Sequence, residues 1–202
     1  MGIELVAIGA SWGGLHAIES VLGALPCDFP AAVVIAQHRR LDSDGDRLAQ
    51  LLDARCALDV RDAEDKQSLE PGTVLVAPAD YHLLVERTRS PEGAGGWVEL
   101  SVDAPEHFSR PSIDVLLGSA AAAYGDRAAG VVLTGANADG ADGLARIARR
   151  GGPAIVQDPD TALRREMPDA ALAATPDAQV VALGDIGTLL CELAGTREGA
   201  QS

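Results

Sequence analysis

The sequence predicts a three-layer α/β/α fold: a doubly wound, mostly parallel sheet with an added antiparallel hairpin. Short apolar runs alternate with helical stretches along almost all of the 202 residues, which is the pattern of βαβ units. The apolar runs are continuous rather than alternating, so the strands should be buried on both faces. Aromatic residues make up only 3% of the chain, and 22 glycines are available for tight strand-to-helix turns. The core should therefore consist mainly of Ala, Val, Leu and Ile.

Six strands of the parallel sheet are expected where turn residues interrupt apolar runs. They are Glu4–Ile8, Ala32–Ala36, Thr73–Val76, Gly130–Leu133, Ala154–Gln157 and Gln179–Ala182. Helices are expected between and after them. They are Gly14–Leu25, Asp46–Ala54, Ser112–Tyr124, Gly140–Arg149, Pro168–Ala174 and Ile186–Ala194.

Two further strand-like runs interrupt this alternation. His82–Glu86 and Trp97–Val102 are separated by the turn-rich segment RTRSPEGAGG, which predicts an antiparallel hairpin. The length and the single pattern favour one domain over residues 1–195. Residues 196–202, TREGAQS, contain too few apolar groups to order themselves and are expected to form a flexible tail.

Composition excludes several classes of function. The formal net charge of −14 argues against binding to nucleic acid or to anionic membranes. The sequence has neither a leader pattern nor an apolar stretch of ~20 residues, so direct membrane insertion is not expected and the location should be cytoplasmic. Cys27, Cys56 and Cys191 lack metal-type spacing, and neither a metal, a disulfide nor a cofactor is predicted.

Three chemically active side chains follow predicted strands. Ser11 follows VAIGA, His38 follows VVIAQ, and Asp139 follows VVLTG within GANADG. The carboxyl ends of parallel strands lie along one edge of a sheet, so these side chains can meet there. A hydroxyl, an imidazole and a carboxylate at one site predict a Ser–His–Asp hydrolase.

Each of these residues also has a simpler interpretation. Ser11 and Asp139 are suitable helix caps, and a histidine at a strand end is often structural. The glycines around Ser11 also invite comparison with a dinucleotide site, but Gly9, Gly13 and Gly14 do not have the required spacing. A single catalytic triad explains the three residues at strand ends more simply than three separate structural roles do.

Six segments in order carry a resemblance to a known family. They are AIGASWGGLHAI, VVIAQH, VLVAPADYHLLVE, RPSIDVLLGSAA, GVVLTGANADGADGL and IVQDPDTALRREMPDAAL. Together they cover most of residues 4–175, and the chain closely resembles the catalytic domain of the chemotaxis protein-glutamate methylesterase (CheB) family. The resemblance is to that domain in a stand-alone form, without the receiver domain that familiar members carry.

The resemblance implies an enzyme that removes methyl esters from glutamate side chains of chemoreceptors and releases methanol. It implies Ser11 as nucleophile, His38 as base and Asp139 as the carboxylate that orients the base. The backbone N–H groups of Trp12 and Ala136 are the candidates for stabilising the oxyanion. The family commonly has Thr and Met at these two positions, so substrate fit is expected to differ.

Two alternatives remain open: deamidation of protein glutamine by the same triad, and a catalytically idle module that binds signalling partners. The expected partners are a methylated chemoreceptor or signalling protein as substrate and a separate regulatory protein. Ammonia rather than methanol as product would select the first alternative, and binding without turnover would select the second.

Several charged residues are candidates for secondary roles. Arg39 and Arg110 are possible residues of the substrate cleft, and Arg40, Arg164 and Arg165 could attract an acidic partner. The histidines His16, His82 and His107 receive no role, although the last two could line the cleft. Asp42, Asp44, Asp46 and Asp53 resemble a calcium loop, but Arg47 occupies the position that requires Gly.

Overall fold

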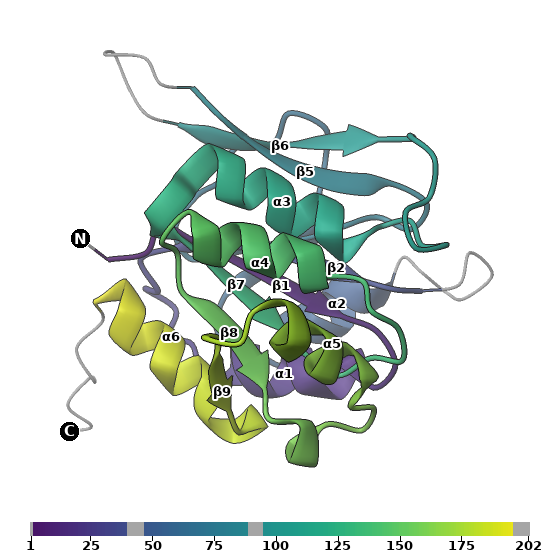
Figure 1. Cartoon of the computed structure of the whole chain (residues 1–202). Coiled ribbons are helices and arrows are strands. Elements are labelled where there is room, and N and C mark those ends of the chain that lie inside the picture. The colour runs from purple at the N-terminus through teal and green to yellow at the C-terminus, as the bar shows by residue number, and fades with distance from the viewer. Residues whose placement is uncertain (1, 40–46, 89–94, 196–202) are drawn as a thin grey trace, which may run out of the picture.

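In a computed structural model of the chain, seven parallel strands form one sheet in the order β3-β4-β2-β1-β7-β8-β9 (Figure 1). The structure describes residues 2–39, 47–88 and 95–195. The strands of this sheet are β1 (Leu5–Ala10), β2 (Ala32–Gln37), β3 (Asp59–Asp62), β4 (Thr73–Val76), β7 (Ala128–Val132), β8 (Ala154–Gln157) and β9 (Gln179–Val181). The predicted fold class, a doubly wound parallel sheet with an added hairpin, is confirmed.

Helices cover both faces of the sheet. They are α1 (Gly14–Gly23), α2 (Leu48–Asp53), α3 (Ile113–Tyr124), α4 (Ala141–Arg149), α5 (Glu166–Ala174) and α6 (Ile186–Ala194). Short 3₁₀ turns lie at Gly125–Arg127, Pro159–Thr161 and Leu183–Asp185. None of the described helices is long and apolar enough to cross a membrane.

The alternation of side chains along each strand divides the core into two layers. In β1, Val6 and Ile8 belong to the cluster that packs on α1, α2 and α6. Leu5 and Ala7 belong to the cluster on the opposite face, which packs on α3, α4 and α5. Every residue of β1 is buried, which explains why the strand appears in the sequence as a continuous apolar run.

The antiparallel hairpin of β5 (His82–Arg87) and β6 (Gly96–Ser101) forms a separate two-stranded sheet. Figure 1 shows it outside α3, beyond the layer that covers the parallel sheet. Its residues Leu83, Val85 and Val98 are buried in the same cluster as α3. The hairpin therefore extends that side of the core.

Among the strands of the described residues, β3 is the one that was not predicted from the sequence. Its sequence, DVRD, buries only Val60, because the strand lies at the edge of the sheet beside β4. An edge strand with one buried residue has no apolar run, and so no sequence signal. The other differences are element ends, such as α5 beginning at Glu166 rather than Pro168, where Glu166 and Met167 continue the helix before its proline.

The strand order changes direction at β1. The chain proceeds from β1 to β2 on one side, and later returns to the other side of β1 as β7. In open α/β sheets the crevice beyond the carboxyl ends at such a point is where ligands bind. This crevice is the place where the segments after β1, β2 and β7 meet.

Candidate active site

Ser11 and His38 stand side by side at the carboxyl edge of the sheet. The N–H of His38 donates to the carbonyl of Ala10 at 3.0 Å, and the N–H of Ser11 donates to the carbonyl of Thr134 at 3.0 Å. These bonds continue the β1–β2 and β1–β7 pairing by one step past the strand ends. The register of the sheet thus brings together residues that lie 27 and 123 positions apart from Ser11 in sequence.

The turn after Ser11 depends on glycine. Gly13 has a φ of 80° and begins α1 without a side-chain cap, so Ser11 is not the cap of this helix. Across the site, a Cβ added to Gly135 would lie 1.8 Å from the sulfur of Met167 and 2.9 Å from the Cβ of Ser11. The loop after β7 approaches the serine this closely only because Gly135 has no side chain.

His38 is held by Asp139. The Nε2 atom of His38 lies 2.7 Å from Oδ2 of Asp139, whose side chain is fully buried. An ionised carboxylate only accepts, so Nε2 is the donor and Nδ1 carries the free lone pair. Nδ1 lies 3.5 Å from the amide nitrogen of Asn137.

Asp139 is also the acceptor for the N-terminus of α3. Its carboxylate accepts from the N–H groups of Ile113 at 2.8 Å and Asp114 at 2.9 Å, and from the hydroxyl of Ser112 at 2.9 Å. Asp139 therefore caps α3, which precedes it in the sequence, and not the helix that follows it. Helix α4 begins at Gly140 without a side-chain cap.

These bonds keep Asp139 ionised. Burial by itself raises the pKa of the carboxyl, but the bonds from His38, Ile113 and Asp114 outweigh it and hold the pKa of Asp139 below its usual value. The negative charge is therefore available to stabilise a protonated imidazole on His38.

An open cleft of about 380 Å³ lies beside the pair. It is lined by Ser11, Trp12, His38, Arg39, Ser109, Ala136 and Asn137. Within the described residues the Ser11 hydroxyl makes no hydrogen bond to His38, so it must turn toward Nδ1 before a proton can pass. Such bonds are often formed only once substrate is bound.

The two predicted oxyanion donors both lie in the cleft wall. Trp12 directly follows the serine, and Ala136 lies on the loop after β7. In the described part of the chain, neither backbone N–H donates to a protein acceptor. Two unused donors near a nucleophile are what stabilisation of a developing oxyanion requires.

The arginines fall into different places. Arg39 lines the cleft, but its side chain is mostly buried and donates to the carbonyl of Ala77. Arg110 is not part of the cleft lining: its guanidinium binds Asp80 and donates to the carbonyls of Val102 and Asp103 at 2.8 and 2.9 Å. Arg110 thus fixes the base of a loop.

Of the other two arginines, Arg164 contacts a residue of the cleft wall. Arg164 lies over the ring of Trp12, 5.9 Å from its centroid. Arg165 pairs with Asp169 at 2.8 Å. Arg40, Asp42, Asp44 and Asp46 lie outside the described residues, and Asp53 accepts from the backbone N–H of Val60.

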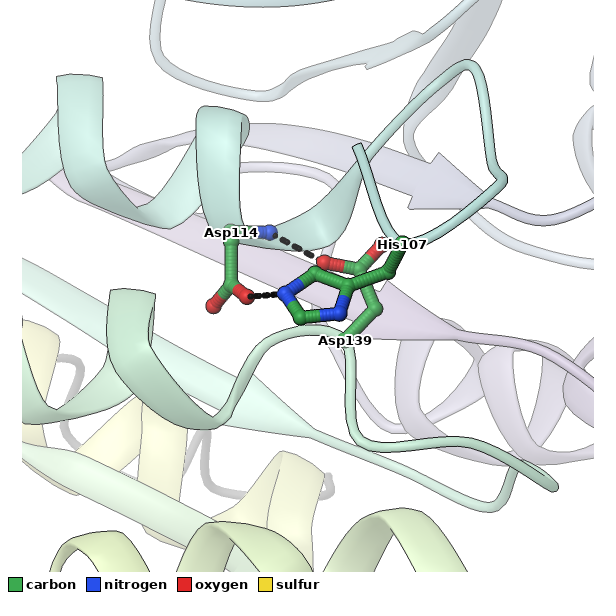
Figure 2. Close-up of side chains that lie close together, drawn as sticks. All are labelled: His107, Asp114 and Asp139. Carbon is green, nitrogen blue, oxygen red and sulfur yellow. Dashed lines mark hydrogen bonds and ion pairs between the residues drawn. The ribbon is translucent and has the colours of Figure 1, made fainter. Parts of the chain in front are cut away.

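The histidines without an expected role are not alike. His16 is exposed on α1. His82 is buried and structural, because its Nδ1 accepts from the N–H of Ser112 and its Nε2 bonds to the carbonyl of Ala104, both at 3.1 Å. His107 pairs with Asp114 at 3.2 Å, next to Asp139 (Figure 2).

His107, Asp114 and Asp139 bring three possible metal-ligand atoms within 4.8 Å of one another. The carboxylates, however, already have donors. Both oxygens of Asp139 accept hydrogen bonds, and Asp114 accepts from the N–H of Gly143 and from His107. The cluster is accordingly explained by hydrogen bonding within the protein.

Three residues that hold the site residues in place were not predicted from the sequence. Ser112 bonds to Asp139, and the side-chain amide of Asn137 reaches His38. The hydroxyl of Thr134 donates to carbonyl oxygens of Trp12 and Arg164 and accepts from the N–H of Arg164 at 2.8 Å. Two of the segments that carry the family resemblance, those with RPSID and VVLTGAN, contain Ser112, Thr134 and Asn137. The resemblance assigned no role to these three residues.

A parallel α/β sheet whose carboxyl edge gathers a serine, an imidazole and a buried carboxylate is the architecture of a hydrolase. The chain belongs to the CheB methylesterase family, whose model matches residues 6–190. It is an enzyme of the protein-glutamate methylesterase type.

Individual relatives agree with this assignment. A relative from Leptospira interrogans is 41% identical over 193 residues, covering 96% of both chains. The protein-glutamate methylesterase/protein-glutamine glutaminase of Moorella thermoacetica is 42% identical, over 95% of this chain and 44% of its own length. The chain superimposes on the CheB methylesterase catalytic domain of Thermotoga maritima with a TM-score of 0.88 and 30% identity, covering 96% of this chain and all of that one.

Proposed function

We propose that the protein hydrolyses methyl esters of glutamate side chains in a chemoreceptor or related signalling protein, with Ser11 as nucleophile. The observation that carries the proposal is the 2.7 Å bond from His38 Nε2 to the buried Asp139, in the wall of the cleft that also contains Ser11. Relatives named protein-glutamate methylesterase support the choice of substrate.

In the proposed reaction, the Ser11 oxygen attacks the ester carbonyl while Nδ1 of His38 takes its proton. The N–H groups of Trp12 and Ala136 stabilise the oxyanion. Collapse of the intermediate breaks the bond to the methoxy group, which leaves as methanol with the proton from His38. Water then attacks the acyl-serine with His38 again as base, and regenerates the hydroxyl.

Trp12 and Arg164 are proposed to contact the substrate beside the reacting glutamate. Trp12 is 63% exposed although it lines the cleft, and Thr134 bonds to the backbone of both residues. This rigid connection places an aromatic face and a cation at the entrance. We also propose that a separate regulatory protein is a partner of this enzyme.

Release of methanol from a methyl-esterified receptor preparation tests the proposed function. The Ser11→Ala variant should lose at least about 10⁴-fold in turnover, because no nucleophile remains. His16→Gln, on the exposed face of α1, is the matched control and should keep the wild-type rate. Equal rates for wild type and Ser11→Ala would contradict the proposal.

Glutamine deamidation is a second candidate, because relatives from Moorella thermoacetica and Bordetella pertussis carry both activities in their names. The same acyl-enzyme would form, with ammonia in place of methanol as the leaving group. Measuring ammonia and methanol from matched glutamine and methyl-glutamate peptides separates the two.

A further inference from the structure

A strained turn lies next to the cleft, between β6 and α3. The N–H of Ser109 donates to the carbonyl of Glu106 at 2.8 Å, which closes a β-turn over residues 106–109. Its two central residues, His107 and Phe108, have φ angles of 48° and 60°. Positive φ at both central positions defines a type I′ turn, which Asn and Gly ordinarily form.

The folded protein gains little from this arrangement by itself. Each non-glycine residue in the left-handed region costs about 1–2 kcal/mol. Phe108 recovers none of this cost, because its side chain is fully exposed and buries no apolar surface. The contacts of the turn itself therefore give no reason for a phenylalanine at this position.

The rest of the protein holds the turn in place. His107 reaches back to pair with Asp114, as Figure 2 shows, and the N–H of Asp114 bonds to Asp139. At the base of the same loop, Arg110 binds Asp80 and the carbonyls of Val102 and Asp103. The turn is therefore fixed at its tip and at its base to the elements that build the site.

The turn ends at the cleft. Ser109, its last residue, lines the cleft together with Ser11 and Trp12. Phe108 directly precedes Ser109 in the chain, and its ring is exposed to solvent. When a protein substrate inserts one side chain into this cleft, the residues beside that side chain contact the rim. Some of them meet Trp12, and others meet the turn.

We propose that Phe108 is a specificity-determining residue that contacts an apolar side chain of the protein substrate near the reacting glutamate, and that His107 is the positioning residue that presents it. This inference rests on the proposed function. The preferred substrate is then a folded segment with an apolar neighbour beside the ester, not an isolated glutamate ester.

The experiment compares two substrates. One is a helical peptide of 20 residues with a single glutamate γ-methyl ester and leucines one turn away. The other is the N-acetyl, N-methylamide derivative of glutamate γ-methyl ester. For Phe108→Ser, the ratio of kcat/KM for the peptide to that for the small ester should fall about tenfold through KM, as expected for partial burial of one aromatic ring. Phe108→Leu should restore most of the ratio.

Control variants sharpen the result. Val180→Ser removes an exposed apolar side chain from β9, away from the cleft, and should leave the ratio unchanged. His107→Ala should lower the ratio as Phe108→Ser does, and His107→Gln, which keeps a donor for Asp114, should restore part of it. An equal loss on both substrates, or an unchanged ratio for Phe108→Ser, would overturn the inference.

Binding provides a readout independent of turnover. With Ser11→Ala as background, calorimetry should show about tenfold weaker binding of the esterified peptide when Phe108→Ser is added. Equal binding would overturn the role of Phe108 whatever the catalytic result. Absence of hydrolysis of both the esterified peptide and the small ester by the wild-type enzyme would instead contradict the proposed function.

Discussion

Asp139 shows how one side chain serves both the fold and the chemistry. Its carboxylate accepts from the imidazole of His38 and from the N–H groups that begin α3. The helix terminus provides donors and a positive end of the dipole. The same contacts that keep the carboxylate ionised also fix the direction from which it holds His38.

Ser112 should matter to catalysis although it does not reach the cleft. Ser112→Ala removes the 2.9 Å hydroxyl bond to Asp139, and a bond to a charged group is worth about 1.5–3 kcal/mol. We expect turnover to fall roughly 10- to 100-fold, because Asp139 holds the imidazole less firmly. Kinetics on the small ester would check this, with Ser112→Thr as the variant that keeps the hydroxyl. A wild-type rate for Ser112→Ala would contradict the account.

Ser11, His38 and Asp139 could be proposed as one site from the sequence because each follows a strand, and the order β2-β1-β7 brings these strand ends together. Ser112 and Asn137 could not be found this way. Their contacts depend on how α3 and the loop after β7 approach the sheet, and no local pattern fixes that approach. The turn at His107 and Phe108 escaped notice for a similar reason, since neither residue favours positive φ.

At the scale of elements, the N-terminus of α3 contains a second buried carboxylate. Asp114 accepts from the N–H of Gly143 and pairs with His107. Burial, with a contribution from the neighbouring charge of Asp139, raises the pKa of Asp114 to about 6, and Asp142 adds to the effect. The pKa values of the two carboxyl groups at this helix end, Asp114 and Asp139, are therefore shifted in opposite directions.

The raised pKa of Asp114 predicts a pH dependence of stability. The folded state holds this proton more tightly than the unfolded state, where the pKa is 3.8. Its contribution to stability is therefore present below about pH 4 and is lost as pH rises through about 6. Asp139, whose pKa is lowered, contributes in the opposite sense and loses its contribution as pH falls below about 4.

The Asp114→Asn variant tests this directly. The free energy of unfolding of the variant should rise relative to that of the wild type by roughly 2 kcal/mol between pH 4.5 and pH 7. Urea denaturation at both pH values gives the difference, and Asp126→Asn, on the 3₁₀ turn after α3, is a control. A difference that does not change with pH would contradict the assignment.

Central strands, which are buried on both faces, were predicted from their apolar runs, and the edge strand β9 was also predicted although none of its residues is buried. The apolar runs of β1 and β2 marked central strands, whereas β3, with one buried residue, gave no signal. The hairpin was found from its turn-rich connection. Its position over α3 could not be predicted, because Leu83, Val85 and Val98 give no indication of which helix they will meet.

At the scale of the whole molecule, the strand-helix alternation fixed the fold class but not the strand order. Several orders are compatible with the same alternation. The observed order puts β1 between β2 and β7, and this placement is what brings the three side chains to one edge.

The net negative charge of the protein should repel an acidic substrate. The formal net charge is −14, and Arg110 and Arg165 have carboxylate partners, while Arg39 lies near Asp62. Raising the salt concentration from 0.02 to 0.2 M screens this field. We therefore expect kcat/KM to rise with salt for an anionic peptide ester and to fall for a cationic one. A fall with salt for the anionic peptide would mean that the arginines steer the substrate.

The most direct measurement of the central claim is intact-protein mass spectrometry after reaction with a fluorophosphonate. The account predicts one phosphonyl adduct, mapped by peptide analysis to Ser11, formed much more slowly in His38→Gln and not at all in Ser11→Ala. An unmodified wild-type protein, or an adduct on another residue that persists in Ser11→Ala, would contradict it.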